Sequence, residues 1–344
     1  MFHKKESATP ALDKDVFSIS ILPMKNKILL LLFIASLLAC QNKESQQDTA
    51  VSTNKLAKPA AMVFKKSNPQ LGDYWYQGKA EVSRYELQQN RYADVHPGEA
   101  VVIFVTEDFL TDKQVKNENY TNPNSTPILK MNMIRKFTTG LYDYTIMSSV
   151  FTPVKVKDFP QTLKVATTTQ EWCGHTYQQL NFLDGLYKNT LHSYFENEAD
   201  QTTEVAYAIL EDELFSRIRM NPDGLPTGKV DILPGTAITR LLHLPFKSLK
   251  ATASLSTYTG TDFSGENLKA YTIEYPGLNR TLEIVFQPEA PYIIEGWTDA
   301  YPSIMDRKVR KSVARRAKTI LTPYWQKNGK DDMALRRELG LEFF

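Results

Sequence analysis

The chain has 344 residues, of which 42% are hydrophobic and 23% charged, a balance that excludes a disordered tail and supports a sizeable buried core. Its 41 basic and 39 acidic side chains leave a formal net charge of +2, so no overall field of one sign recruits nucleic acid. Any electrostatic partner must therefore be recognised by a local patch.

The N-terminal region predicts export and lipidation. Lys25 and Lys27 precede an apolar run over 28–39, which is the order of charge and hydrophobicity of a secretory signal peptide. The run ends in Leu37-Leu38-Ala39-Cys40, which matches the lipobox of bacterial lipoproteins. We therefore expect a covalent lipid on Cys40 and no other cofactor. A run of about a dozen residues is too short for a transmembrane anchor, which needs roughly twenty.

The segments that flank this signal have different expected roles. Residues 1–23 carry several charges, whereas Met24 begins an ordinary signal peptide, so we expect translation to start at Met24. Residues 40–67 are polar and predict a flexible tether. Gln41 is not the aspartate that often retains lipoproteins at the inner membrane, so the sequence favours the outer membrane. It leaves open whether the protein faces the periplasm or the cell surface.

Residues 68–344 predict a single, mainly β (α+β) domain, because alternation with β-branched and aromatic enrichment dominates. Strands are expected over 100–105, 142–156, 163–180, 249–258, 268–275 and 282–286. A mid-chain helix is expected from Thr203 to Asn221-Pro222, and a C-terminal basic helix over 307–324. Helices do not alternate with strands, so we predict a curved antiparallel sheet or barrel-like shell.

The predicted helix over 307–324 combines an apolar side with many cationic residues. The cationic residues are Arg307, Lys308, Arg310, Lys311, Arg315, Arg316 and Lys318. Such a helix would either rest on anionic lipid head groups, gaining about 1 kcal/mol for each basic residue, or cap a sheet with its charges solvated. Both interpretations stay open.

The segment Glu171–His175 holds the main candidate for chemistry. Only two cysteines occur in the chain, so lipidation of Cys40 leaves Cys173 as a lone thiol. Asp184-Gly185 predicts a two-residue hairpin turn, in which the numbers of paired residues sum to 369. This register gathers four reactive side chains on one face of the sheet, within reach of a common point. They are Cys173, His175, His192 and Glu196.

Three interpretations of this cluster remain. His175 or His192 would activate the Cys173 thiolate while a carboxylate orients the imidazole. Alternatively, sulfur, nitrogen and oxygen ligands would hold a zinc-like metal. In the third interpretation, Cys173 is a small structural residue and the face is solvated or lines a ligand site. A one-residue bulge would send every partner to the other face and end the first two interpretations.

Other titratable residues carry weaker signals. His243 lies in a leucine-rich context, which favours a core histidine. The carboxylates of Glu211-Asp212-Glu213 are expected on a solvated helix face. Glycine-rich phosphate loops, the Gly-x-Ser-x-Gly elbow and the His-Glu-x-x-His motif do not occur in the sequence.

Five segments carry a resemblance to a known family: Tyr74–Glu81, Val105–Phe109, Gln170–His175, His192–Glu196 and Leu225–Gly228. They resemble a family of uncharacterised lipoproteins of the Bacteroidota, over nearly all of the mature chain. Its members are often labelled "septum formation inhibitor Maf". The family offers no catalytic residues to carry over. True Maf proteins are cytoplasmic α/β nucleotide pyrophosphatases, whereas this chain is expected to be exported and β-rich.

Three functions are therefore open. The leading one is a membrane-anchored envelope lipoprotein that acts as a non-enzymatic binding or structural module for a lipid, glycan or envelope protein. The second is an envelope enzyme or metal site that uses Cys173 with His175 or His192. The third, if the family label is literal, is nucleotide pyrophosphate hydrolysis. An apolar cavity would favour the binding module. A polar pocket that converges on Cys173 would favour the enzyme, and carboxylates around a metal would favour pyrophosphate hydrolysis.

Overall fold

The computed structural model describes residues 71–341. The expected signal peptide, Cys40 and the tether over 40–67 lie outside these residues. Within them, sixteen strands form one sheet. The first strands are β1 (Ala80–Arg91), β2 (Asp94–Leu110), β3 (Val115–Lys116), β4 (Ser125–Thr139), β5 (Tyr142–Pro153), β6 (Lys164–Glu171), β7 (Gly174–Leu183), β8 (Leu186–Ser193) and β9 (Gln201–Ala206).

The second half of the chain holds the remaining strands and the α-helices. Its strands are β10 (Ile209–Leu210), β11 (Gly228–Leu233), β12 (Leu249–Thr257), β13 (Lys269–Tyr275), β14 (Arg280–Phe286), β15 (Ile294–Pro302) and β16 (Val309–Thr322). The α-helices among residues 71–341 are α2 (Leu214–Met220), α3 (Thr236–Leu242) and α4 (Met333–Leu339). The short 3-10 helices are η2 (Asp73–Trp75), η3 (Glu211–Glu213), η4 (Pro222–Gly224), η5 (Pro276–Leu278), η6 (Tyr324–Gln326) and η7 (Lys330–Asp332). None of these helices is long and apolar enough to cross a membrane.

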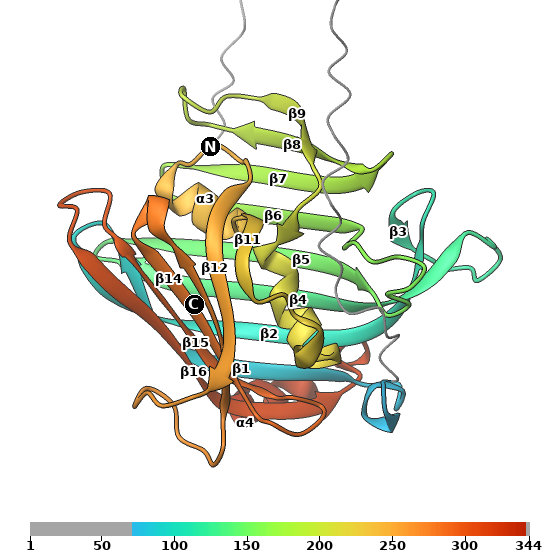
Figure 1. Cartoon of the computed structure of the whole chain (residues 1–344). Coiled ribbons are helices and arrows are strands. Elements are labelled where there is room, and N and C mark those ends of the chain that lie inside the picture. Colours follow the sequence, from blue (N-terminus) through green and yellow to red (C-terminus); the bar gives the residue numbers. More distant parts are fainter. Residues whose placement is uncertain (1–70, 342–344) are drawn as a thin grey trace, which may run out of the picture. The chain divides into compact units, whose positions relative to one another are not determined.

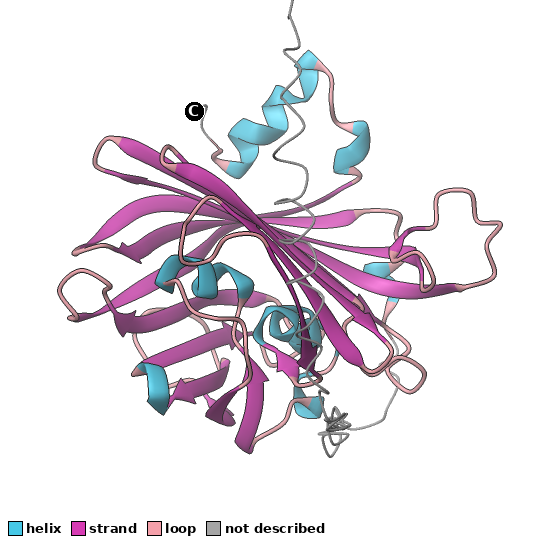
Figure 2. Cartoon of the chain, turned by 90° about the horizontal axis from the view of Figure 1, so that it is seen from above, coloured by secondary structure: helices cyan, strands magenta, loops and turns pink. Residues whose placement is uncertain are grey.

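The sheet is a curved antiparallel shell that does not close. Its order is β10-β11-β12-β13-β14-β15-β16-β1-β2-β4-β5-β6-β7-β8-β9, with β3 attached to β2. Within this sheet, the two-residue strand β10 supplies the parallel pair, with β11. Figures 1 and 2 show α2 and α3 inside the curve of the sheet and α4 on its outer side. The predicted mainly β class and the curved antiparallel sheet are confirmed.

The period-two pattern explains which face of each strand is buried. Along β5, every second residue is buried: Tyr144, Ile146, Ser148 and Val150. The inner face of the sheet and the two enclosed helices share one apolar core, in which every residue of α2 is buried. The shell is therefore packed with side chains.

Buried ion pairs fix the enclosed elements to the sheet. Arg219 of α2 makes two contacts with the carboxylate of Glu81 on β1, one of them at 2.6 Å. Arg280 of β14 donates to Glu211 of η3 and to Asp299 of β15, at 2.6 and 2.7 Å. Charged groups are buried at tolerable cost when they are paired in this way. The expectation that the carboxylates of 211–213 are solvated is thus wrong, because Glu211 is buried against Arg280 and Glu213 is fully buried.

One predicted strand and one predicted helix need correction. Residues 163–180 form two strands, because Trp172 and Cys173 make a turn between β6 and β7. Gly174 allows this turn: its φ is +157°, and a Cβ there would lie 2.7 Å from the ring of Tyr194. The mid-chain helix is confined to η3 and α2, since residues 201–206 pair with β8 as strand β9.

The helix predicted over 307–324 is wrong, because these residues form strand β16, between β15 and β1. A bulge explains the misleading pattern: Arg316 pairs with Tyr85 and Lys318 with Arg84, so Ala317 is an extra residue. An inserted residue shifts the alternation by one position and so resembles helical spacing. A C-terminal helix does exist, but as α4, after the strand.

Candidate functional site

The hairpin predicted around Asp184-Gly185 is confirmed. Both residues have positive φ, 54° and 84°, as a type I′ turn requires. Tyr177 pairs with His192, which matches the predicted sum of 369. The predicted register is therefore correct over most of β7 and β8.

The four-residue cluster does not assemble, because the ladder ends at the pair Thr176–Ser193. Cys173 is exposed in the turn between β6 and β7, and His175, His192 and Glu196 are exposed as well. His192 Nδ1 instead lies 3.2 Å from a carboxylate oxygen of Asp200. Within residues 71–341, neither a hydrogen bond nor an ion pair joins two of the four. The same residues contain no group of three or more His, Cys, Asp or Glu side chains arranged to hold a metal ion.

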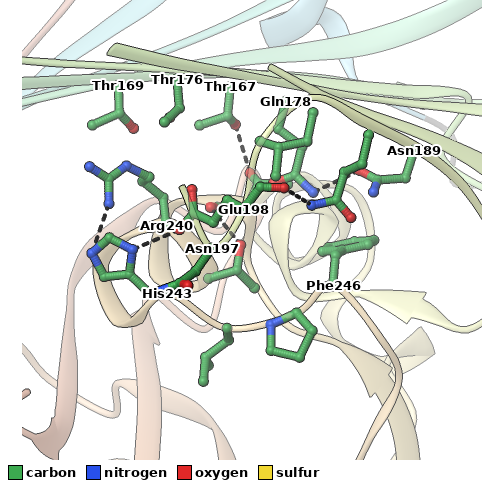
Figure 3. Close-up of a pocket in the computed structure, with 16 residues that line it drawn as sticks. Thr167, Thr169, Thr176, Gln178, Asn189, Asn197, Glu198, Arg240, His243 and Phe246 are labelled. Carbon is green, nitrogen blue, oxygen red and sulfur yellow. Dashed lines mark hydrogen bonds and ion pairs between the residues drawn. The ribbon is translucent and has the colours of Figure 1, made fainter. Parts of the chain in front are cut away.

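A polar pocket lies on the inner face of the sheet, between β6–β8 and α3, with a volume of about 240 Å³. Figure 3 shows its walls. The residues that line it are Thr167, Thr169, Thr176, Gln178, Asn189, Leu191, Asn197, Glu198, Gln201, Thr236, Thr239, Arg240, His243, Leu244, Pro245 and Phe246. Cys173 is not among them.

Hydroxyl and amide groups form the sheet side of this pocket. Thr167 and Thr169 on β6 and Thr176 and Gln178 on β7 occupy the inward positions of their strands and are buried. Gln178 Nε2 donates to Asn189 Oδ1 at 2.8 Å. Hydrogen bonding of this kind fixes the positions of the polar wall.

Helix α3 supplies the opposite side through Arg240 and His243. Arg240 forms an ion pair with Glu171 through Nη2, and its guanidinium carbon lies 4.1 Å from the centre of the Phe195 ring. Burial lowers the pKa of Arg240, and the charge of Glu171 opposes that shift. His243 Nδ1 lies 2.7 Å from Glu198, which belongs to the loop between β8 and β9.

The expectation of a core histidine at position 243 is wrong. His243 has a φ of 51° as the C-cap of α3, and it is exposed at the edge of the pocket. A left-handed C-cap turns the chain away from the helix axis. The side chain therefore leaves the leucine-rich surroundings and meets Glu198.

Two residues that line this pocket each have a buried polar atom without a hydrogen-bond partner: Thr169 Oγ1 and Arg240 Nε. The two residues are 1% and 7% exposed. Leaving a buried donor or acceptor unsatisfied costs about 1–3 kcal/mol, more for a charged group. A bound molecule, an ion or an ordered water next to such an atom would satisfy it.

Comparisons with protein-family models, curated proteins and solved structures gave no match.

A second, narrower cavity holds charged groups next to this pocket. Arg135, Glu211, Asp212 and Arg280 line it. Burial, together with the charge of Glu211, raises the pKa of Asp212 to about 7, although hydrogen bonds from Thr236 oppose the shift. Thr236 donates to Asp212 through its backbone N–H and lies with its hydroxyl 2.6 Å from that of Thr167. Asp212 thereby holds Thr236 in place next to Thr167 of the polar wall.

The basic residues of 307–318 are distributed along a strand and are partly neutralised. Four of the seven form ion pairs with carboxylates: Arg310 with Asp306, Lys311 and Arg315 with Asp262, and Arg316 with Glu295. The three carboxylates reduce, but do not cancel, the local positive charge that would attract anionic lipid. The proposed membrane-surface patch thus loses its amphipathic helix and part of its positive charge.

Sequence reasoning missed the pocket, although one signal was present. Val165 and Leu180 are inward and apolar, whereas the neighbouring inward positions carry threonine and glutamine. Polar residues in the buried phase of a strand indicate a functional or hydrogen-bonded site. Arg240 gave no such signal, because its partner Glu171 lies 69 residues away.

Proposed function

We propose that this protein is a lipid-anchored lipoprotein of the bacterial envelope that binds a small polar ligand in the pocket between β6–β8 and α3. The observation that carries the ligand site is that two residues lining the same polar cavity, Thr169 and Arg240, each have a buried polar atom without a partner, Oγ1 and Nε. The anchor is proposed from the lipobox at Cys40, and outer-membrane placement from Gln41.

The contents of the shell disfavour a lipid as the ligand. Its inner face is occupied by one packed apolar core with α2 and α3, and the pocket beside that core is walled by hydroxyl and amide groups. An acyl chain in this pocket would leave the buried hydroxyl of Thr169 without a partner, at about 1–3 kcal/mol. A polar molecule of a few ring atoms meets both the lining and the volume.

The test is a thermal-shift screen of polar small molecules against the full chain, purified in detergent. We expect at least one compound to bind the natural protein and to bind the Thr169→Val variant about tenfold more weakly, since tenfold corresponds to about 1.4 kcal/mol. Thr126→Val is the matched control, because Thr126 is also 1% exposed with an unpartnered hydroxyl but lies outside the pocket.

Hydrogen exchange measured by mass spectrometry locates the bound compound. We expect protection in the peptides that cover β6, β7 and the loop over 194–200. Compounds that bind both threonine variants equally well, or that protect peptides elsewhere, would contradict the proposed site.

A further inference from the structure

The charged and titratable groups around the pocket have partners within the protein. Glu171 neutralises Arg240, and both side chains are buried, at 3% and 6% exposure. Glu198 faces His243 at 2.7 Å. An anionic ligand would lie next to a carboxylate unless it displaced Glu171 from Arg240, and a cationic ligand would compete with Arg240 for Glu171. An uncharged ligand leaves both pairs intact, so the electrostatics favour it.

The remaining capacity of the pocket is for hydrogen bonds in both directions. Thr169 Oγ1 can donate and accept, whereas Arg240 Nε only donates. Amide side chains of Gln178, Asn189 and Asn197 add donors and acceptors along the wall. A ligand that matches such a mixed set carries both donors and acceptors, and a hydroxyl group supplies both at once.

The pocket also has an apolar side. Leu244, Pro245 and Phe246 follow α3 and line it. In Figure 3 the threonines of β6 and β7 lie along one side of the cavity, and Phe246 lies apart from them. A sugar ring has the same two-sided character, with hydroxyl groups around its edge and C–H groups on its faces that pack on apolar or aromatic side chains.

The size of the pocket limits the ligand. Its volume of about 240 Å³ is below the roughly 300–1,000 Å³ of pockets for drug-sized molecules. One ring fits this space better than an extended chain. We infer that the pocket binds an uncharged saccharide through a single sugar ring, an inference that rests on the proposed polar-ligand function.

The test compares matched neutral and charged sugars by ligand-observed saturation-transfer NMR on the full chain in detergent. The neutral probes are galactose, glucose, mannose and N-acetylglucosamine. Galacturonate and glucosamine are the charged counterparts, which differ from galactose and glucose by one group. We expect at least one neutral sugar to bind, and its charged counterpart, where the panel has one, to bind at least tenfold more weakly.

Two variants tie this binding to the pocket. Thr169→Val and Phe246→Ala should each weaken the neutral sugar about tenfold or more, from the hydroxyl side and the apolar side of the ring. Thr126→Val should leave its affinity unchanged. Equal losses in Thr126→Val would show that the effect comes from a general change in the fold, and would overturn the inference.

The results separate the two proposals. Tighter binding of galacturonate or glucosamine than of the neutral sugars, with sensitivity to Thr169→Val, would overturn the uncharged saccharide and keep the polar-ligand pocket. Binding by none of the six sugars would also overturn the saccharide inference. The proposed function would then be decided by the thermal-shift screen, whose failure in addition would remove the pocket itself.

Discussion

Asp212 contributes both to the stability of the fold and to the structure of the pocket wall. Its carboxylate accepts hydrogen bonds from the backbone and the hydroxyl of Thr236, at 2.9 and 3.1 Å. Thr236 in turn lies against Thr167 in the polar wall. The position is electrostatically unfavourable for a charged carboxylate, because burial and the charge of Glu211 raise the pKa of Asp212 to about 7.

This pKa predicts a decrease in stability with rising pH. An unfolded aspartate has its ordinary lower pKa, so between about pH 4 and pH 7 the folded chain holds a proton that the unfolded chain has lost. The free energy of unfolding should therefore fall as pH rises through this window. The Asp212→Asn variant should lose that fall, on the order of 2 kcal/mol between about pH 5 and pH 8.

Urea denaturation of the full chain at the two pH values measures this difference. Asp231→Asn, which alters an exposed aspartate, is the control and should retain the pH dependence of the natural protein. The same dependence in the Asp212→Asn variant would contradict the assignment of the effect to this carboxylate.

Cys173 gives a second prediction at this scale. The thiol is exposed in a turn, and within residues 71–341 no hydrogen bond or ion pair joins it to a histidine. The rate of iodoacetamide alkylation at Cys173, followed by peptide mapping across a pH series, should therefore be the same in the natural protein and in His175→Ala. A clear drop in the variant would restore the activated-thiolate hypothesis.

At the scale of elements, one buried ion pair joins α2 to the sheet in addition to their apolar contacts. Arg219 and Glu81 are almost completely inaccessible, at 0% and 1% exposure of their side chains. Burial alone would raise the pKa of Glu81, but the guanidinium of Arg219 and a hydrogen bond from Tyr74 hold it below its usual range. The pair therefore stays ionised. A substitution of one partner alone would leave the other as an unpaired buried charge.

Arg219→Met should destabilise the protein by about 3–5 kcal/mol, because it leaves the buried Glu81 without a partner. The double variant Glu81→Gln with Arg219→Met should recover part of this loss. Lys250→Met, at an exposed ion pair with Asp231, is the control and should have little effect. Chemical denaturation measures all three, and a double variant no more stable than Arg219→Met alone would contradict the explanation.

Local chemistry determined which elements could be predicted from the sequence. Asp184-Gly185 encodes its turn type in two residues, so the register of β7 with β8 followed from it. The break at Gly174 and the bulge at Ala317 depend on neighbours that are distant in sequence, and both were missed. The pocket also depends on residues that are distant in sequence, because Arg240 is placed against β6 only by the packing of α3 inside the shell.

At the scale of the whole molecule, the predicted architecture is confirmed at the level of class and curvature, and the anchor stays a prediction. We expect Cys40→Ala to abolish incorporation of labelled palmitate and to release the protein from the membrane fraction. Cys173→Ala should change neither. Retention of the Cys40→Ala variant on membranes without acylation would contradict the lipid anchor and direct attention back to the unpaired basic residues Arg307, Lys308 and Lys318.

The open sheet ends, among the described residues, in β9, which pairs on one side only, with β8. Proteins tethered to one membrane, as proposed here, share an orientation and diffuse in two dimensions, so exposed strand edges would meet often. Strand β9 spans Gln201–Ala206, and its exposed residues are polar, including Glu204. Short, charged edges resist joining with another sheet. The sheet can therefore stay open at β9 without pairing edge to edge with the sheets of neighbouring molecules on the membrane.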